Sequence, residues 1–185
     1  RKLGQEGYVA TSLNNIGMIY SNWGQYDKAI KHFKEALVIV RKLGQEGYVA
    51  TSLNNIGGVY LSWGQYDKAL KHFKEALAIN KRLGMEADVA RDRNNIGGVY
   101  NSWGQYDKAI KYYEEALAIV RKLGQEDYIA GGLNNIGRVY SDWGQHDKAI
   151  KHFKEALAIN KRLGMEADVA TSLNNIGMIY SNWGQ

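Results

Sequence analysis

The 185-residue chain contains no proline and no cysteine, and only three phenylalanines and four histidines. The absence of cysteine excludes disulfides and thiolate metal sites, and the absence of proline removes the strongest interruption of a helix. The longest apolar runs, such as residues 36–40, are far too short to cross a bilayer, so we expect no membrane association. An abundance of Ala, Leu, Lys, Glu and Ile in such a chain favours a soluble, all-helical protein.

The formal net charge of +5 raises nucleic acid as a partner, because clustered cations attract phosphate. The lysines do not form a patch of positive charge alone, however. Lys28, Lys31 and Lys34 share one predicted helix face with Asp27 and Glu35. Mixed signs of this kind are typical of an ordinary solvated face, so we expect no nucleic-acid binding.

One block organises the whole sequence. It begins Leu13-Asn14-Asn15-Ile16-Gly17 and returns at residues 53, 93, 133 and 173, always 40 residues later, with arginine replacing the leucine at Arg93. A fixed period of this size indicates a repeat array. We expect one continuous array over residues 1–185, with units at about 5–44, 45–84, 85–124 and 125–164 and a partial unit at 165–185. Because Arg1 falls in the tail of a helical pattern, we also expect the chain to be a piece of a longer array.

Each unit contains two helical patterns. In residues 46–63 the apolar side chains recur at steps of three and four, as one face of a helix requires. A second pattern covers residues 66–83, and Gly64 between the two suits a left-handed helix end. Asp67 is available there as a cap or as an acid in the first turn of the second helix. These two helices use all 40 positions, so the fold class is all-α.

The order Leu13, Ile16-Gly17, Tyr20, Ala29, Phe33, Ala36 resembles the tetratricopeptide repeat pattern, and the resemblance covers the entire chain. Two features depart from it. Leucine occupies the first aromatic position of the family, and Arg41 stands where its closing proline would fall, which lengthens the unit to 40 residues from the usual ~34. The longer unit is similar to those of kinesin light chains, spindle-orientation adaptors and prokaryotic signalling arrays.

The resemblance implies a right-handed α-solenoid of about nine antiparallel helices whose first helices line a concave groove. It also implies that the groove binds an extended peptide or a helix of a partner protein. Positions facing the groove vary between units while the packing positions barely change, as expected of a binding scaffold. The predicted peptide-binding residues are Asn14, Asn54, Asn94, Asn134, Asn174, Asn15, Asn55, Asn95, Asn135, Asn175, Arg91, Arg138, Met18 and Asn101.

The paired asparagines are present in all five units. An amide offers both a donor and an acceptor, which matches a peptide backbone, and in relatives an asparagine near this position often holds the main chain of the ligand. The alternative is that one member of each pair bonds a neighbouring helix and fixes the spacing of the units.

The third unit departs most from the others, because Arg91-Asp92-Arg93 replaces Thr-Ser-Leu. The arginines could form a clamp for an acidic peptide or a C-terminus. The alternative, which we favour slightly, is an internal Arg–Asp network in which the stem of Arg93 covers apolar surface. Arg138 in the following unit belongs to the same question.

Three further sets of recurring residues are interpreted as packing residues. The tryptophans that end the first helices are expected in the core, and the histidines at one repeat position are expected to pack, since Tyr112 replaces them in one unit. A glycine in the middle of each first helix is expected to allow close contact with small residues such as Ala29. The tryptophans are Trp23, Trp63, Trp103, Trp143 and Trp183, and the histidines are His32, His72 and His152.

No phosphate loop, metalloprotease helix or nucleophile elbow occurs, so we expect no enzyme, no cofactor and no metal site. The favoured function is a scaffold for a protein or peptide ligand, with a cytoplasmic location. The first alternative is self-association, in which the uncapped terminal helices stack end to end. The second is a sensor or regulatory arm of a larger signalling protein, which fold analogy alone supports.

Overall fold

The computed structural model describes the backbone of residues 2–183 and the side chains of residues 5–181. Arg1 and the side chain of Trp183 lie outside the described residues. The chain forms two compact units, residues 1–99 and residues 100–185, and each unit is considered by itself. The boundary falls within one helix, so its last turn belongs to the second unit.

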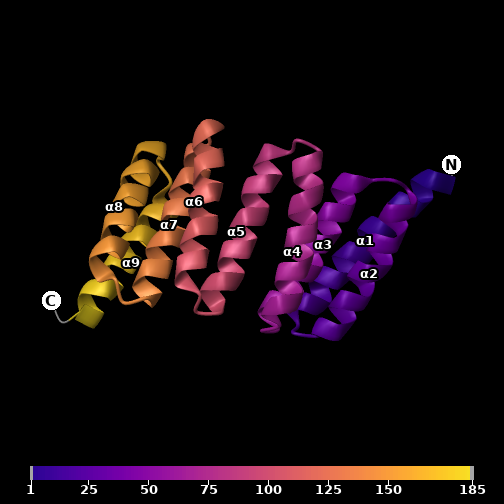
Figure 1. Cartoon of the computed structure of the whole chain (residues 1–185), viewed down its shortest axis with the longest axis horizontal. Helices are drawn as coiled ribbons and strands as arrows, with labels where there is room; N and C mark the ends of the chain where they lie inside the picture. The colour runs from indigo at the N-terminus through magenta and orange to yellow at the C-terminus, as the bar shows by residue number, and fades with distance from the viewer. Residues whose placement is uncertain (1, 184–185) are drawn as a thin grey trace. The chain divides into compact units, whose positions relative to one another are not determined.

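Nine α-helices account for the described residues, which contain no β-strand (Figure 1). The all-α prediction is therefore confirmed. The helices are α1 (Lys2–Asn22), α2 (Tyr26–Lys42), α3 (Glu46–Ser62), α4 (Tyr66–Arg82), α5 (Glu86–Ser102), α6 (Tyr106–Lys122), α7 (Glu126–Asp142), α8 (His146–Leu163) and α9 (Glu166–Trp183).

Glycine ends the helices in the predicted manner. Gly64 follows α3 with φ of 73°, a left-handed conformation that costs glycine little. The Gln65 N–H donates to the carbonyl of Tyr60 at 2.8 Å, and the Gly64 N–H donates to that of Leu61 at 2.9 Å, so the last carbonyls of α3 are satisfied. Asp67 lies in the first turn of α4, where its negative charge interacts favourably with the positive end of the helix dipole. Gln65 occupies the N-cap position, and its side chain makes no capping hydrogen bond.

In the first unit, α1 packs against α2 and α3, and α3 packs against both α2 and α4. Phe33, Leu53, Ile56 and Phe73 are almost completely buried between these helices. Each of these side chains lies on the apolar stripe of its helix, so the spacing in the sequence accounts for the core.

The recurring mid-helix glycine allows an aromatic ring to approach the backbone. A Cβ atom built on Gly57 would lie 2.8 Å from the ring of Phe73, and one built on Gly17 would lie equally close to Phe33. The close neighbour is therefore the phenylalanine of the second helix, and the expectation that Ala29 fills this role was wrong.

In the second unit, α7 packs against α6 and α8, and α8 packs against α9. Tyr113 of α6 takes the place that phenylalanine holds in the other second helices and is just as deeply buried. A Cβ atom built on Gly137 would lie 2.8 Å from the ring of Phe153, as at the equivalent glycines of the first unit.

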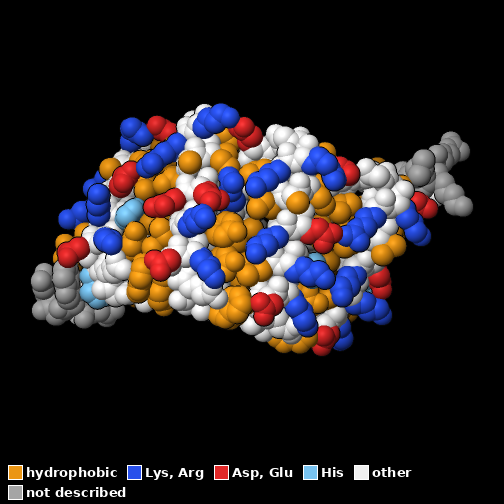
Figure 2. All heavy atoms as spheres, in the orientation of Figure 1, with side chains coloured by type: hydrophobic (Ala, Val, Ile, Leu, Met, Phe, Trp, Pro, Cys, Tyr) orange, Lys and Arg blue, Asp and Glu red, His pale blue; other side chains and the backbone are white. Residues whose placement is uncertain are grey.

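The outward faces of the second helices carry ion pairs that join one repeat to the next. Arg41 of α2 contacts Glu75 of α4 at 2.7 Å, and Arg121 of α6 contacts Glu155 of α8 at 3.2 Å. Acidic and basic side chains are interspersed across the face shown in Figure 2. None of the helices in the described part of the chain has the length and apolar character needed to cross a membrane.

Candidate binding surface

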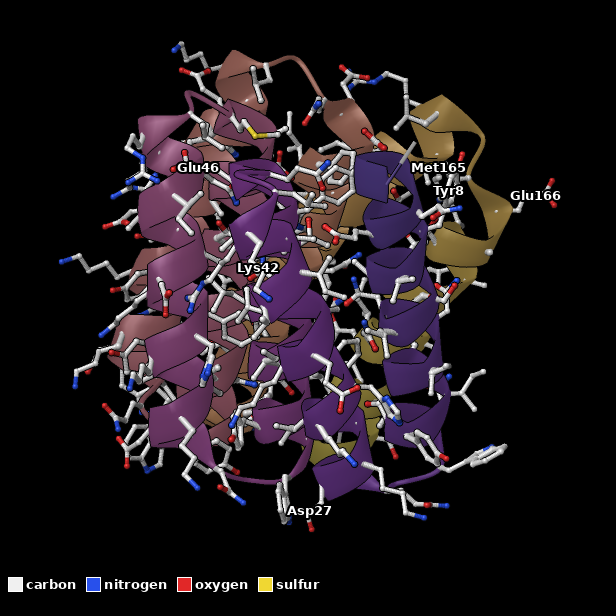
Figure 3. The ribbon with its side chains drawn as sticks, turned by 90° about the vertical axis from the view of Figure 1, so that its right-hand side faces the viewer. Tyr8, Asp27, Lys42, Glu46, Met165 and Glu166 are labelled. Carbon is white, nitrogen blue, oxygen red and sulfur yellow. The ribbon has the colours of Figure 1, made fainter. Side chains whose placement is uncertain are left out.

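A pocket of about 290 Å³ opens on the first unit, between α1, the end of α2 and the start of α3. Tyr8 of α1 and Tyr48 of α3, which occupy the same repeat position, line it and are 78% and 61% exposed. Figure 3 shows Tyr8 near the upper end of α1, at the edge of the hairpin. Thr11 and the predicted residue Asn14 form part of the same wall. The other lining residues are Gly7, Ala10, Val40 and Gln45.

The first asparagine of each pair is partly buried in four of the five units. The Oδ1 atoms of Asn14, Asn54, Asn94 and Asn134 are all covered, and none accepts a hydrogen bond. Because the same atom is covered each time, these amides share one orientation. Asn174 is exposed, and its Nδ2 lies 3.8 Å from the sulfur of Met178.

Asn54 is engaged within the array. Its Nδ2 donates to Asp92 Oδ1 at 2.6 Å, and Nδ2 of Asn80 donates to Asp92 Oδ2 at 2.7 Å. These bonds join α3 and α4 to α5. They match the alternative interpretation of the asparagines, in which one member of a pair bonds a neighbouring helix and fixes the spacing of the repeats. An equivalent but longer contact joins Asn160 of α8 to Ser172 of α9 at 3.4 Å.

Asp92 is a fully buried carboxylate at this junction. Burial raises its pKa above the ordinary value of 3.8, while the bonds from Asn54 and Asn80 and the charge of Arg91 act in the opposite direction. Sequence reasoning grouped Asp92 with the arginines, but its two oxygens accept from amides. The signal that could have found this triad is the joint occurrence of Asn80 and Asp92 where the chain has Val40 and Ser52 one repeat earlier.

The second asparagine of each pair is more variable. Asn15 is exposed, whereas Asn55, Asn95 and Asn175 are partly buried. Asn135, also partly buried, accepts a hydrogen bond from Arg138 Nη2 at 3.2 Å. No described contact assigns one function to this position in every unit, so its contact with a ligand stays a prediction.

Arg91 and Arg138 each have a partner within their own compact unit. Arg91 is exposed and pairs with Asp88 one turn earlier on α5, at 2.6 Å. Arg138 hydrogen-bonds the hydroxyl group of Tyr113, and this bond satisfies a polar group that is buried away from water. Burial raises the pKa of Tyr113, and the charge of Arg138 partly offsets that rise.

Two other predicted residues take different positions. Asn101, at the end of α5 in the second unit, donates from Nδ2 to Asp142 Oδ2 at 3.0 Å. Met18 of α1 is exposed. Met18 is therefore accessible to a ligand, whereas Asn101 is already hydrogen-bonded to a neighbouring helix of the array.

The four tryptophans whose side chains are described, at positions 23, 63, 103 and 143, are 38–67% exposed, so the expectation that they lie in the core was wrong for them. Trp63, for example, is 38% exposed and packs on Tyr26 of the preceding turn, with ring centroids 5.8 Å apart. Trp143 repeats this contact with Tyr106 at the same separation. In both contacts the tyrosine belongs to the preceding repeat, so these two half-covered tryptophan rings lie between consecutive repeats.

The histidines do pack as predicted. His72 lies against the ring of Tyr60 at 5.3 Å, and Lys68 approaches the same ring at 5.4 Å, so the tyrosine contacts both an imidazole and a cation. The contact recurs with Tyr20 and His32 and with Tyr140 and His152. Its repetition marks it as part of the frame of the unit.

The fold and this surface define a class of helical repeat proteins whose antiparallel hairpins present first-helix side chains to solvent. The sequence profile described as tetratricopeptide repeat matches residues 8–82, 88–162 and 128–185. The chain therefore belongs to the tetratricopeptide repeat family. No curated protein matches it by sequence.

Several solved structures are similar to the chain. BtubC (BKLC) from P. vanneervenii is 26% identical, with a TM-score of 0.83 over 97% of this chain and 74% of that one. A putative kinesin light chain of Podosopora anserina with nearly identical TPR-like repeats is 18% identical, with a TM-score of 0.78 over 97% and 89%.

Two further similar structures are longer than this chain. Aspartyl phosphate phosphatase F from Bacillus subtilis is 20% identical, with a TM-score of 0.88, and the match covers 99% of this chain but 47% of that protein. A Rap protein complexed with competence and sporulation factor is 22% identical, with a TM-score of 0.78 over 93% and 48%. At this level of identity the likeness concerns the fold.

Proposed function

We propose that the chain is a non-enzymatic interaction module that binds an extended peptide or a helix of a partner protein along the exposed faces of its first helices. The observation that carries the proposal is the pocket between α1 and α3, because two exposed tyrosines and an asparagine amide converge there. The complex of a Rap protein with competence and sporulation factor is a precedent for partner binding on the same fold.

The residues of the pocket suit a peptide. Tyrosine supplies a large contact area at a low cost in conformational entropy and has a hydroxyl group for hydrogen bonds. Because the amide oxygen of Asn14 is covered, its amide nitrogen is the end that would donate to a ligand carbonyl. Tyr8 and Tyr48 would then flank the bound segment, and Thr11 would lie beside it.

The test begins with selection of peptides from a random display library on the immobilised chain. Binding of an enriched, fluorescently labelled peptide is then measured by anisotropy. We expect Tyr48→Ala and Asn14→Ala each to weaken binding by about tenfold, the loss typical of a central interface contact.

Tyr128→Ala is the matched control, because Tyr128 occupies the same repeat position in the second unit, is comparably exposed and does not line this pocket. Loss of binding in the Tyr128 variant with none in the Tyr48 and Asn14 variants would contradict the assignment of the site. Selection that enriches no binding peptide would contradict the function itself.

A further inference from the structure

The face of α9 that turns away from α8 is open. Leu173 is 50% exposed, whereas Leu53 at the same repeat position is 1% exposed. A Cβ atom built on Gly177 would meet no atom within 4 Å, although the equivalent glycines at 17, 57 and 137 each lie directly beneath a phenylalanine. The α9 helix therefore presents a glycine surface of the kind that elsewhere in the chain accepts an aromatic ring.

The sequence identifies the helix that fits this surface. Residues 10–25 and residues 170–185 are identical. In the first unit, residues 10–22 of this segment belong to α1, where α2 places the Phe33 ring on Gly17 and stacks His32 on Tyr20 at 5.4 Å. Since α9 carries the same residues, α2 can make the same contacts with α9.

We propose that α9 of one chain docks against α2 of a second copy and takes the place of α1 there. The α1 helix is the most easily replaced, because its side chains Tyr8, Val9 and Ile19 are exposed and, among the described residues, it packs mainly on α2. The exchange preserves the contacts around Phe33 and covers the open face of α9, and it uncovers the matching face of the displaced α1, so the added contact between α8 and α2 is what favours association.

Charge complementarity favours the same arrangement. Consecutive second helices are joined by Arg41 to Glu75 and by Arg121 to Glu155. When α2 of a second copy follows α8, Lys161 takes the position of the arginine and Glu35 that of the acid. The new contact between α8 and α2 therefore continues the row of ion pairs that each compact unit already contains.

Each chain has one α9 and one α2, so the interface joins two different surfaces. Such a head-to-tail contact extends into open chains unless its rotation closes a ring. We therefore expect a mass that rises continuously with concentration. This self-association is independent of the peptide pocket proposed above.

Three substitutions test the exchange by sedimentation velocity and light scattering over a concentration series. Gly177→Leu places a side chain where the single chain has open space, but where a docked Phe33 would come within about 3 Å of its Cβ. We expect it to weaken association by about tenfold or more. Gly131→Leu is the matched control, because Gly131 is also in a helix with nothing within 4 Å.

The third substitution, Gly17→Leu, forces α1 away from Phe33. It frees α2 and should strengthen association, while the double variant Gly17→Leu/Gly177→Leu should not associate. Far-UV circular dichroism checks that Gly177→Leu retains the wild-type helix content.

The expected result is a wild-type mass above 20.8 kDa that rises with concentration, with Gly131→Leu behaving alike. A wild-type mass that stays at 20.8 kDa throughout would overturn the proposal. So would a Gly177→Leu protein that associates as strongly as the wild type. If Gly17→Leu fails to strengthen association, replacement of α1 is ruled out.

Discussion

Gly57→Ala separates two opposing contributions to the stability of the repeat. Removing a helical glycine stabilises a helix by about 1 kcal/mol, but the added methyl group would lie 2.8–3.0 Å from three ring atoms of Phe73. Phe73 is 2% exposed, so its ring has no open space into which to move. Overpacking in a close-packed core costs about 1–3 kcal/mol, and we therefore expect a net destabilisation of roughly 1 kcal/mol.

Gly177→Ala is the internal comparison, because the same substitution meets nothing within 4 Å. It should stabilise the chain by up to about 1 kcal/mol. For a chain of this length 1 kcal/mol corresponds to about 2–4 °C in Tm, so thermal unfolding followed by circular dichroism should place the two variants on opposite sides of the wild type.

A double-mutant cycle with Phe73→Leu isolates the contact, because the smaller side chain relieves the clash. The Gly57→Ala change should cost less in that background. A Gly57→Ala protein at least as stable as the wild type would refute the explanation of this glycine, and so would equal costs in both backgrounds.

Three other substitutions test buried and exposed polar contacts. The pKa of Asp92 is raised by burial, and a carboxyl group with a raised folded-state pKa stabilises the fold fully at low pH and loses that contribution as the pH rises through the folded-state pKa. Urea unfolding at a series of pH values should therefore show the wild type losing stability relative to Asp92→Asn as the pH rises above about 4, and a constant difference would contradict the raised pKa. Tyr113→Phe should cost about 0.5–1.5 kcal/mol in the wild type but almost nothing beside Arg138→Met; equal thermal shifts in the two backgrounds would show that the residues are not coupled. Arg41→Ala removes an exposed pair with Glu75 and should cost less than about 1 kcal/mol, with a smaller effect in high salt.

The regular features of the fold were predictable because they depend on spacing within one unit. The patterns at 46–63 and 66–83 agree with α3 (Glu46–Ser62) and α4 (Tyr66–Arg82) to within one residue. Gly64 has the predicted left-handed conformation. Periodicity and glycine positions determine these features locally.

The candidate site was less predictable because its contacts join residues far apart in the sequence. Asn54 bonds Asp92, 38 positions later, and Asn101 bonds Asp142, 41 positions later. Helical spacing places each side chain on a face, but it does not say which partner an adjacent helix supplies. The same limit explains the error over Trp63, since its covering residue, Tyr26, belongs to the preceding unit.

Departures from the repeat sequence fall into two physical groups. Some occur in pairs that contact one another. Asp92 accepts from Asn80, and Arg138 bonds the hydroxyl group of Tyr113. A buried polar substitution is tolerated when a second substitution satisfies its hydrogen bonds, so paired departures are accounted for by the array itself.

Exposed side chains that the array does not use form the other group. Tyr48 and Met18 are large, exposed and not needed to satisfy a buried polar atom. This asymmetry favours the pocket beside Tyr48 over the arginines as the ligand site, because Arg91 already pairs with Asp88 and Arg138 already serves Tyr113.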